Sequence, residues 1–99
     1  GVAELGKDKQ IIGIEEKPEK PKSNFAVTGL YQYDHRVFDI IKKVNPSQRG
    51  ELEISDVNNA YIELNALHSE LVKRYWVDAG TIKSLAKATS LLSRLQNEN

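Results

Sequence analysis

The pattern of apolar and polar residues predicts a β-hairpin at the start of the chain. Residues 1–5 are typical of a short strand, residues 10–16 alternate weakly and carry Ile11, Ile12 and Ile14, and the polar stretch between them is typical of a turn. Pro18 and Pro21 should end the second strand, because proline has no N–H to donate to a sheet. Residues 25–33 are rich in aromatic and β-branched side chains and therefore predict a third strand.

Helical spacing of apolar residues follows in the middle of the chain. Asp34 is a suitable N-cap, and apolar residues recur at helical intervals between residues 37 and 44. Pro46 should stop this helix. Ser55 is a suitable cap for a second helix. The apolar face of that second helix consists of Val57, Ala60, Tyr61 and Leu64.

The last third of the chain predicts one more strand and one more helix. Residues 69–77 carry bulky apolar side chains that indicate a strand. Thr81 is a suitable cap for a helix with an apolar stripe at Ile82, Leu85, Ala88, Leu92 and Leu95. The order is then β-β-β-α-α-β-α. We expect an α/β fold, with one mixed sheet and helices packed against it.

Composition restricts the classes of function. The chain has 99 residues, of which 39% are hydrophobic and 28% charged, as expected for one globular domain at most. Fourteen basic residues balance fourteen acidic ones, so we expect no binding to nucleic acid or to a membrane surface. Cysteine is absent, no apolar run is long enough to cross a bilayer, and no secretion signal opens the chain. We therefore expect a cytoplasmic protein.

The first residues and the apolar faces suggest that this is part of a larger molecule. The chain opens inside a predicted strand and has no initiator methionine. We expect a single partial domain over residues 1–99, taken from a longer protein. Strand edges and apolar surface that lack their normal partners tend to associate, so we also expect a homo-oligomer.

Charged residues at the end of the second predicted strand are suited to a phosphorylated sugar. Pro18 breaks the strand there, so Glu16 and Lys17 can reach one pocket although neighbours in a strand point to opposite faces. A carboxylate accepts hydrogen bonds from sugar hydroxyls, and an ammonium group supplies a point charge for phosphate. The alternative is a solvated strand edge, which is the usual place for charged side chains.

Two further side chains suit a phosphate and its metal ion. Asp78 lies where a predicted strand meets a glycine turn, and Mg²⁺ commonly takes one or two carboxylates together with phosphate oxygens. The alternative is an ordinary turn aspartate. Arg49 lies in a loop, and its guanidinium can bind a phosphate in a forked geometry. The alternative is a solvated arginine paired with Glu51 or Glu53.

Five segments, taken in order, resemble the sugar nucleotidyltransferase family. They are G-V at 1–2, I-E-E-K-P at 14–18, K-S-N-F-A-V-T-G-L-Y at 22–31, R-G-E-L-E-I-S-D at 49–56 and W-V-D-A-G-T at 76–81. The resemblance covers essentially the whole chain. It is closest to the C-terminal part of members that make dTDP-glucose and pyrophosphate from glucose 1-phosphate and dTTP. It implies the C-terminal half of a Rossmann-like nucleotidyltransferase domain.

The resemblance also implies a role for individual residues. Glu16 would contact sugar hydroxyls, and Lys17 would contact the sugar phosphate. Gly1 and Val27 would offer backbone groups to the sugar, and Arg49 would lie near the sugar phosphate. Lys17 and Arg49 are the expected catalytic residues, because phosphoryl transfer depends on positioning and charge neutralisation.

Metal binding and the nucleotide complete what the resemblance implies. Asp78 would be one of two Mg²⁺ ligands. The glycine-rich, arginine-bearing segment with which the family cradles the nucleoside triphosphate is not among these 99 residues. We therefore expect the chain alone to be inactive. The alternative is a noncatalytic binding or assembly module derived from the same fold.

Overall fold

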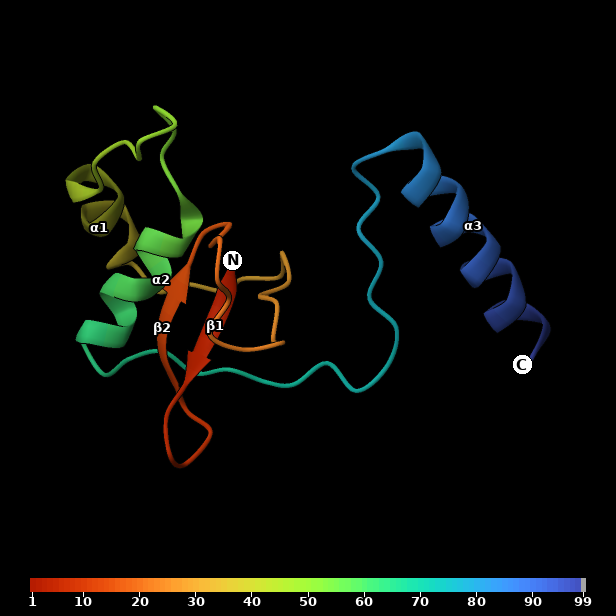
Figure 1. Cartoon of the computed structure of the whole chain (residues 1–99), viewed down its shortest axis with the longest axis horizontal. Coiled ribbons are helices and arrows are strands. Elements are labelled where there is room, and N and C mark those ends of the chain that lie inside the picture. Colours follow the sequence, from red (N-terminus) through yellow and green to blue (C-terminus); the bar gives the residue numbers. More distant parts are fainter. Residues whose placement is uncertain (99) are drawn as a thin grey trace.

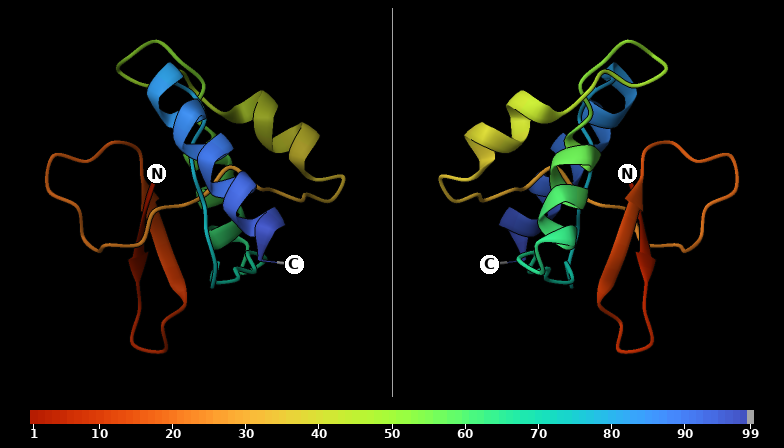
Figure 2. Two further views of the ribbon diagram at one scale, coloured as in Figure 1. Left: turned by 90° about the vertical axis from the view of Figure 1, so that its right-hand side faces the viewer. Right: turned by 90° about the vertical axis from the view of Figure 1, so that its left-hand side faces the viewer.

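The computed structural model describes residues 1–98 and contains two strands and three helices in that range (Figure 1). They are β1 (Val2–Leu5), β2 (Ile11–Glu15), α1 (Val37–Lys43), α2 (Ile54–Glu63) and α3 (Ile82–Asn97). The hairpin of β1 and β2 lies on one side of α2, and α1 lies on the other (Figure 2). No helix within the described residues is long and apolar enough to cross a membrane.

The predicted N-terminal hairpin is confirmed. β1 and β2 are antiparallel, with Val2 opposite Glu15 and Ala3 opposite Ile14. The polar turn between them is closed by a hydrogen bond from the Gly6 N–H to the Gln10 carbonyl (2.8 Å). β2 ends at Glu15, so the residues that follow leave the sheet as the prolines predict.

A small core joins the hairpin to α2. Its buried apolar residues are Ala3, Ile14, Val57 and Tyr61. The side chain of Asn59 on α2 adds a polar connection: its oxygen accepts from the Ile14 N–H, and its amide nitrogen donates to the Ile14 carbonyl, both at 2.8 Å. This double contact satisfies backbone groups that would otherwise need a third strand beside β2. It therefore sets the position of α2 along β2.

The third strand predicted at residues 25–33 is wrong over most of its length. Ala26 forms only an isolated antiparallel bridge with Val2, and the Val27 N–H donates to the Gly1 carbonyl (2.9 Å). Because this segment runs antiparallel to β1, residues after Val27 pass beyond Gly1 and have no strand opposite them among the described residues. A strand without a neighbour cannot form sheet hydrogen bonds.

Side-chain contacts to α2 hold the rest of that segment. The Tyr33 hydroxyl donates to Asn58 Oδ1 (2.6 Å), and its ring stacks on Tyr61 with the centroids 5.5 Å apart. The Tyr61 hydroxyl in turn donates to Asp34 Oδ1 (2.9 Å). Asp34 was expected to cap α1, but the N-cap position is Arg36, and the Asp34 carboxylate accepts from the Arg36 side chain and N–H. Asp34 therefore holds the turn before α1 rather than the helix end itself.

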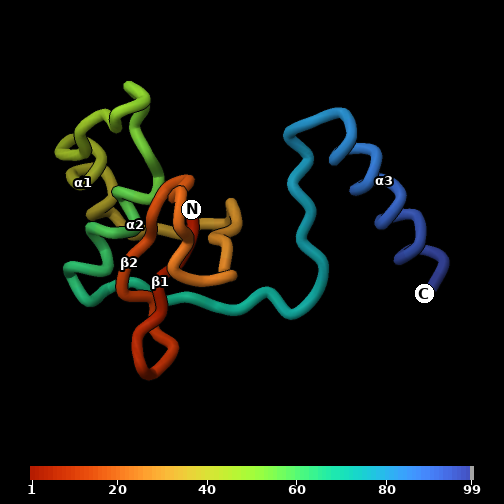
Figure 3. The backbone as a smooth tube through the Cα atoms, in the orientation of Figure 1, coloured from red at the N-terminus to blue at the C-terminus, as the bar shows by residue number. Residues whose placement is uncertain are grey.

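The strand predicted at residues 69–77 is also wrong, and so is the mixed sheet that it would have completed. The chain from 66 to 81 is an extended connection between α2 and α3 (Figure 3). Leu71 is 64% exposed and Tyr75 is 67% exposed. Apolar residues of this kind form a strand only beside a partner, and the described part of the chain offers none. The sheet within residues 1–98 is the two-stranded antiparallel hairpin.

Besides the start of α1, three further helix ends were predicted, of which two agree with the structure and one differs. α1 ends at Lys43, ahead of Pro46 as predicted. Thr81 caps α3 through a reciprocal capping box with Ser84, as its residue type predicts. α2 begins one residue before Ser55, and its N-cap position is Glu53, whose side chain makes no capping hydrogen bond. Ser55 was therefore wrongly expected to be the cap, and its hydroxyl is free for another contact.

Candidate functional site

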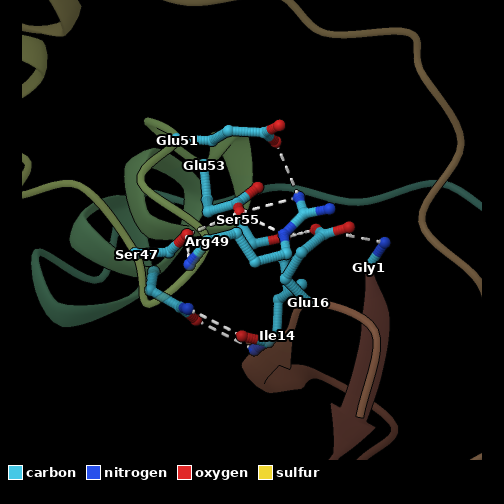
Figure 4. Close-up of polar contacts among 9 residues, drawn as sticks. Gly1, Ile14, Glu16, Ser47, Arg49, Glu51, Glu53 and Ser55 are labelled. Atoms are coloured by element: carbon cyan, nitrogen blue, oxygen red, sulfur yellow. Dashed lines mark hydrogen bonds and ion pairs between the residues drawn. The ribbon is translucent and has the colours of Figure 1, made fainter.

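Polar side chains gather where the end of β2 meets the loop before α2. The group, which we call the Arg49 cluster, consists of Gly1, Glu16, Ser47, Arg49, Glu51, Glu53 and Ser55 (Figure 4). Three separate parts of the chain supply it: the start of β1, the end of β2, and residues 47–55. The packing of α2 on β2 brings these parts together.

Glu16 is held by a buried hydroxyl. The Ser55 hydroxyl donates to Glu16 Oε2 (2.7 Å), and the Gly1 nitrogen lies 3.4 Å from the same oxygen. Ser55 is buried, whereas the Glu16 side chain keeps 23% of its surface exposed. The hydrogen bond from Ser55 lowers the pKa of Glu16, while burial opposes this effect. Glu16 is therefore an oriented, charged acceptor at neutral pH.

Gly1 is packed so closely that a side chain would collide. A Cβ built at Gly1 would lie 2.8 Å from Ser55 Oγ and 2.9 Å from Ile14 Cγ2, which is closer than carbon atoms normally approach. Its carbonyl accepts from the Val27 N–H (2.9 Å). The two residues from which the sequence predicted backbone contacts to a sugar are thus neighbours in the structure.

Arg49 is paired with two carboxylates. Its Nε and Nη2 donate to Glu53 Oε1 at 3.1 and 2.8 Å, and Nη2 lies 3.0 Å from Glu51 Oε2. The hydrogen bond with Glu53 raises the pKa of Arg49, and the same contact lowers the pKa of Glu53, with a further contribution from Ser47. The pairing that the alternative interpretation of Arg49 predicted is present, with both glutamates.

The loop that carries Arg49 has a defined backbone. The Ser47 N–H donates to the Glu51 carbonyl and the Gly50 N–H donates to the Ser47 carbonyl, each at 2.8 Å. Gly50 has a φ of 76°, a left-handed conformation that glycine adopts without steric penalty. This turn aims the Arg49 side chain back over the start of α2.

Lys17 lies next to the cluster in a strained conformation. Its φ is 42°, which is unfavourable for a residue with a side chain, and it precedes Pro18, which restricts it further. The pKa of Glu53 is lowered first by Arg49 and then by Ser47, and the charge of Lys17 adds to the effect. Strained residues of this kind tend to occur at functional sites, and the Lys17 side chain is exposed.

Asp78 is not brought to the Arg49 cluster. It lies on the extended connection to α3, and its carboxylate accepts from the Gly80 N–H (3.3 Å). Within residues 1–98, no group of three or more metal-binding side chains is present. The exposed Asp78 carboxylate nevertheless suits Mg²⁺ as one ligand, because this ion commonly takes one or two carboxylates and completes its shell with phosphate oxygens and water.

Sequence reasoning missed four members of the cluster as functional candidates. Ser55 was interpreted as a helix cap, and Glu51 and Glu53 only as possible partners that neutralise Arg49. Ser47, which donates to Glu53 Oε1 (2.9 Å), was not singled out. Only the structure shows that Glu53 is at an N-cap position, for which glutamate is a poor match, so its side chain is available for another role.

The sequence matches the nucleotidyl transferase family over residues 1–94, and the chain belongs to this family. Similar proteins include the glucose-1-phosphate thymidylyltransferases of Neisseria meningitidis, 46% identical over 98% of this chain, and of Xanthomonas campestris, 47% identical over 97%. The protein of that name from Mycolicibacterium smegmatis is 41% identical over 97% of the chain. The aligned regions cover 34%, 33% and 34% of those three proteins. The chain therefore spans about a third of their length.

Proposed function

We propose that this chain is the C-terminal, sugar 1-phosphate-binding portion of a nucleotidyltransferase. The complete enzyme would make dTDP-glucose, or a related nucleotide sugar, and pyrophosphate from glucose 1-phosphate and dTTP. One observation supports this most: an oriented carboxylate, Glu16, and two cations, Lys17 and Arg49, meet at one end of the hairpin. Relatives with the name glucose-1-phosphate thymidylyltransferase support the choice of substrates.

The residues of the cluster suit binding and charge neutralisation. In the proposed reaction an oxygen of the sugar phosphate attacks the α-phosphorus of dTTP, and the bond to pyrophosphate breaks. No covalent enzyme intermediate is needed, so positioning and electrostatic stabilisation carry the catalysis. Glu16 would accept hydrogen bonds from sugar hydroxyls, while Lys17 and Arg49 would hold the sugar phosphate. Gly1 and Val27 would place backbone groups against the sugar ring.

Mg²⁺ is the metal ion that the proposed reaction would use. Asp78 would supply one carboxylate ligand, and bound Mg²⁺ would neutralise charge on the phosphates. The second carboxylate and the cradle for dTTP would come from the part of the enzyme outside this chain. Residues 1–99 would then be one partial domain that does not turn over substrate alone. A homo-oligomeric state and a cytoplasmic location stay predictions.

Binding of glucose 1-phosphate to the 99-residue chain tests the proposal. We expect a titration followed by NMR to shift the backbone resonances of Gly1, Lys17 and Arg49, with tighter binding than for glucose or for inorganic phosphate. Glu16→Gln should weaken binding of both glucose and glucose 1-phosphate, because a neutral amide is a weaker acceptor. Lys17→Ala should weaken binding only of the phosphorylated ligands. Shifts that are equal for phosphate and glucose 1-phosphate, and insensitive to Glu16→Gln, would contradict a sugar site.

An assembly module is the second candidate, and a specific feature favours it. A groove of about 620 Å³ lies between the hairpin and residues 67–76, and Leu5, Phe25, Leu71 and Trp76 are among its apolar lining. The apolar residue Ile82 on α3 is 90% exposed. Exposed apolar surface of this kind often marks an interaction site. Self-association of the chain without any binding of glucose 1-phosphate would favour this candidate over the enzyme portion.

A further inference from the structure

The contacts around Arg49 divide into one with a largely shielded glutamate, Glu53, and one with an exposed glutamate, Glu51. Glu53 Oε1 accepts three hydrogen bonds, two from Arg49 and one from the Ser47 hydroxyl, and the Glu53 side chain is only 11% exposed. Glu51 makes a single 3.0 Å contact with Arg49 Nη2, and its side chain is 63% exposed. The two glutamates carry the same charge but hold the guanidinium in different ways.

Glu53 occupies the N-cap position of α2, but its side chain does not cap the helix. It is the N-cap residue of α2, where Ser, Thr, Asp or Asn normally accept hydrogen bonds from the first turn. The Glu53 side chain makes no such bond and turns instead toward Arg49. Departures from local preference of this kind are expected at functional sites rather than at purely structural ones. The contact with Arg49, rather than helix capping, therefore explains why a glutamate is suitable at position 53.

We propose that Glu53, held by Ser47, is the positioning residue that aims Arg49 at the sugar phosphate, and that the bound phosphate takes the place of Glu51. The inference rests on the proposed function and extends it. Glu53 contacts the guanidinium through Nε and Nη2 and makes no contact with Nη1, so part of the guanidinium is left for another acceptor. Glu51 occupies a donor that a phosphate oxygen would use, and an exposed ion pair is weak enough to be exchanged.

Two substitutions with the same change in charge separate positioning from simple electrostatics. Glu51→Ala and Glu53→Ala each remove one negative charge close to Arg49. If charge alone mattered, both variants would bind a phosphate ligand more tightly. We expect opposite effects. Glu51→Ala should tighten binding of glucose 1-phosphate about two- to fivefold, because a competing surface ion pair is lost. Glu53→Ala should weaken it about two- to tenfold, because binding must then order a mobile arginine.

The experiment has one arm without ligand and one with it. In the 99-residue chain, the heteronuclear NOE of the Arg49 Nε–Hε group reports the order of its side chain before any ligand is added. This NOE should fall in Glu53→Ala, stay near the parent value in Glu51→Ala, and recover in part in Glu53→Gln, which keeps an acceptor oxygen without the charge. Titrations with glucose 1-phosphate and with inorganic phosphate at constant ionic strength then give the affinities.

The two arms distinguish failure of this inference from failure of the proposed function. An Arg49 side chain as ordered in Glu53→Ala as in the parent overturns the positioning role. Tighter binding in both alanine variants overturns it as well. If Glu53→Ala frees Arg49 but neither the parent nor any variant binds glucose 1-phosphate, the anchoring by Glu53 stands and the assignment of the sugar site falls.

Discussion

The contact between Asn59 and Ile14 offers the most direct test of how the fold builds the site. The Asn59 side chain pairs with both backbone groups of Ile14 at 2.8 Å, and this contact sets α2 on β2. The same packing places the Ser55 hydroxyl 2.7 Å from Glu16. Asn59→Ala removes both hydrogen bonds and keeps the helix backbone, because alanine has the highest helix propensity. It should therefore destabilise both the packing of α2 on the hairpin and the Arg49 cluster that depends on it.

The size of the effect follows from the groups that lose their partners. The Ile14 side chain is buried, and both contacts of its backbone with Asn59 are partly buried. A buried donor or acceptor left without a partner costs about 1–3 kcal/mol, so two partly buried groups suggest about 2–4 kcal/mol. For a domain of this size, 1 kcal/mol shifts the melting temperature by about 4–8 °C. We expect a decrease of at least about 8 °C, which is a large effect for a domain whose total stability is only about 5–15 kcal/mol.

Circular dichroism melting of the 99-residue chain measures this effect, and NMR of the Glu16 carboxylate shows whether the site follows. Glu63→Ala is the matched control, because Glu63 lies on the same helix and is exposed. Substitutions of that kind usually change stability by less than about 0.5 kcal/mol. The reasoning is refuted if Asn59→Ala melts within about 3 °C of Glu63→Ala, a difference that corresponds to less than about 1 kcal/mol.

Three further predictions concern pH dependence, helix capping and association. The lowered pKa of Glu16 means that its contribution to stability is present above the ordinary carboxyl value and is lost as pH falls through the folded pKa. Ser55→Ala should therefore reduce stability to urea more at about pH 6 than at about pH 3, and an equal loss at both would contradict the role given to this hydrogen bond. Thr81→Ala should lower the helical circular dichroism signal, because a helix of this length is marginal without tertiary packing. It should leave the melting of the hairpin and α2 unchanged, because within the described residues α3 contacts no other helix or strand. Ile82→Glu with Leu92→Glu should reduce self-association in light scattering; a parent chain that is monomeric throughout the concentration range would remove the basis for this prediction.

Local sequence determined the elements whose stability is local. The two short apolar stretches at residues 1–5 and 10–16, with a polar turn between them, are sufficient to predict the hairpin, because a short turn pairs two neighbouring strands without help from elsewhere. Thr81 is sufficient to predict the start of α3, because the capping box lies within four consecutive residues. Pro46 is sufficient to predict that α1 ends before it, because proline lacks the N–H that a helix requires.

Tertiary structure decided the features that depend on contacts with a distant part of the chain, namely strand pairing and the contacts of the candidate site. Residues 25–33 and 69–77 have the composition of strands, but a strand forms only when another backbone lies beside it, and composition does not reveal whether one does. The candidate site shows the same limit. The sequence pointed to Glu16 and Arg49 as candidates, but the contacts with Ser55 and Glu53 depend on the packing of α2 against β2 and on the turn at residues 47–51. Residue type determines which chemistry is available, and packing determines which groups are close enough to use it.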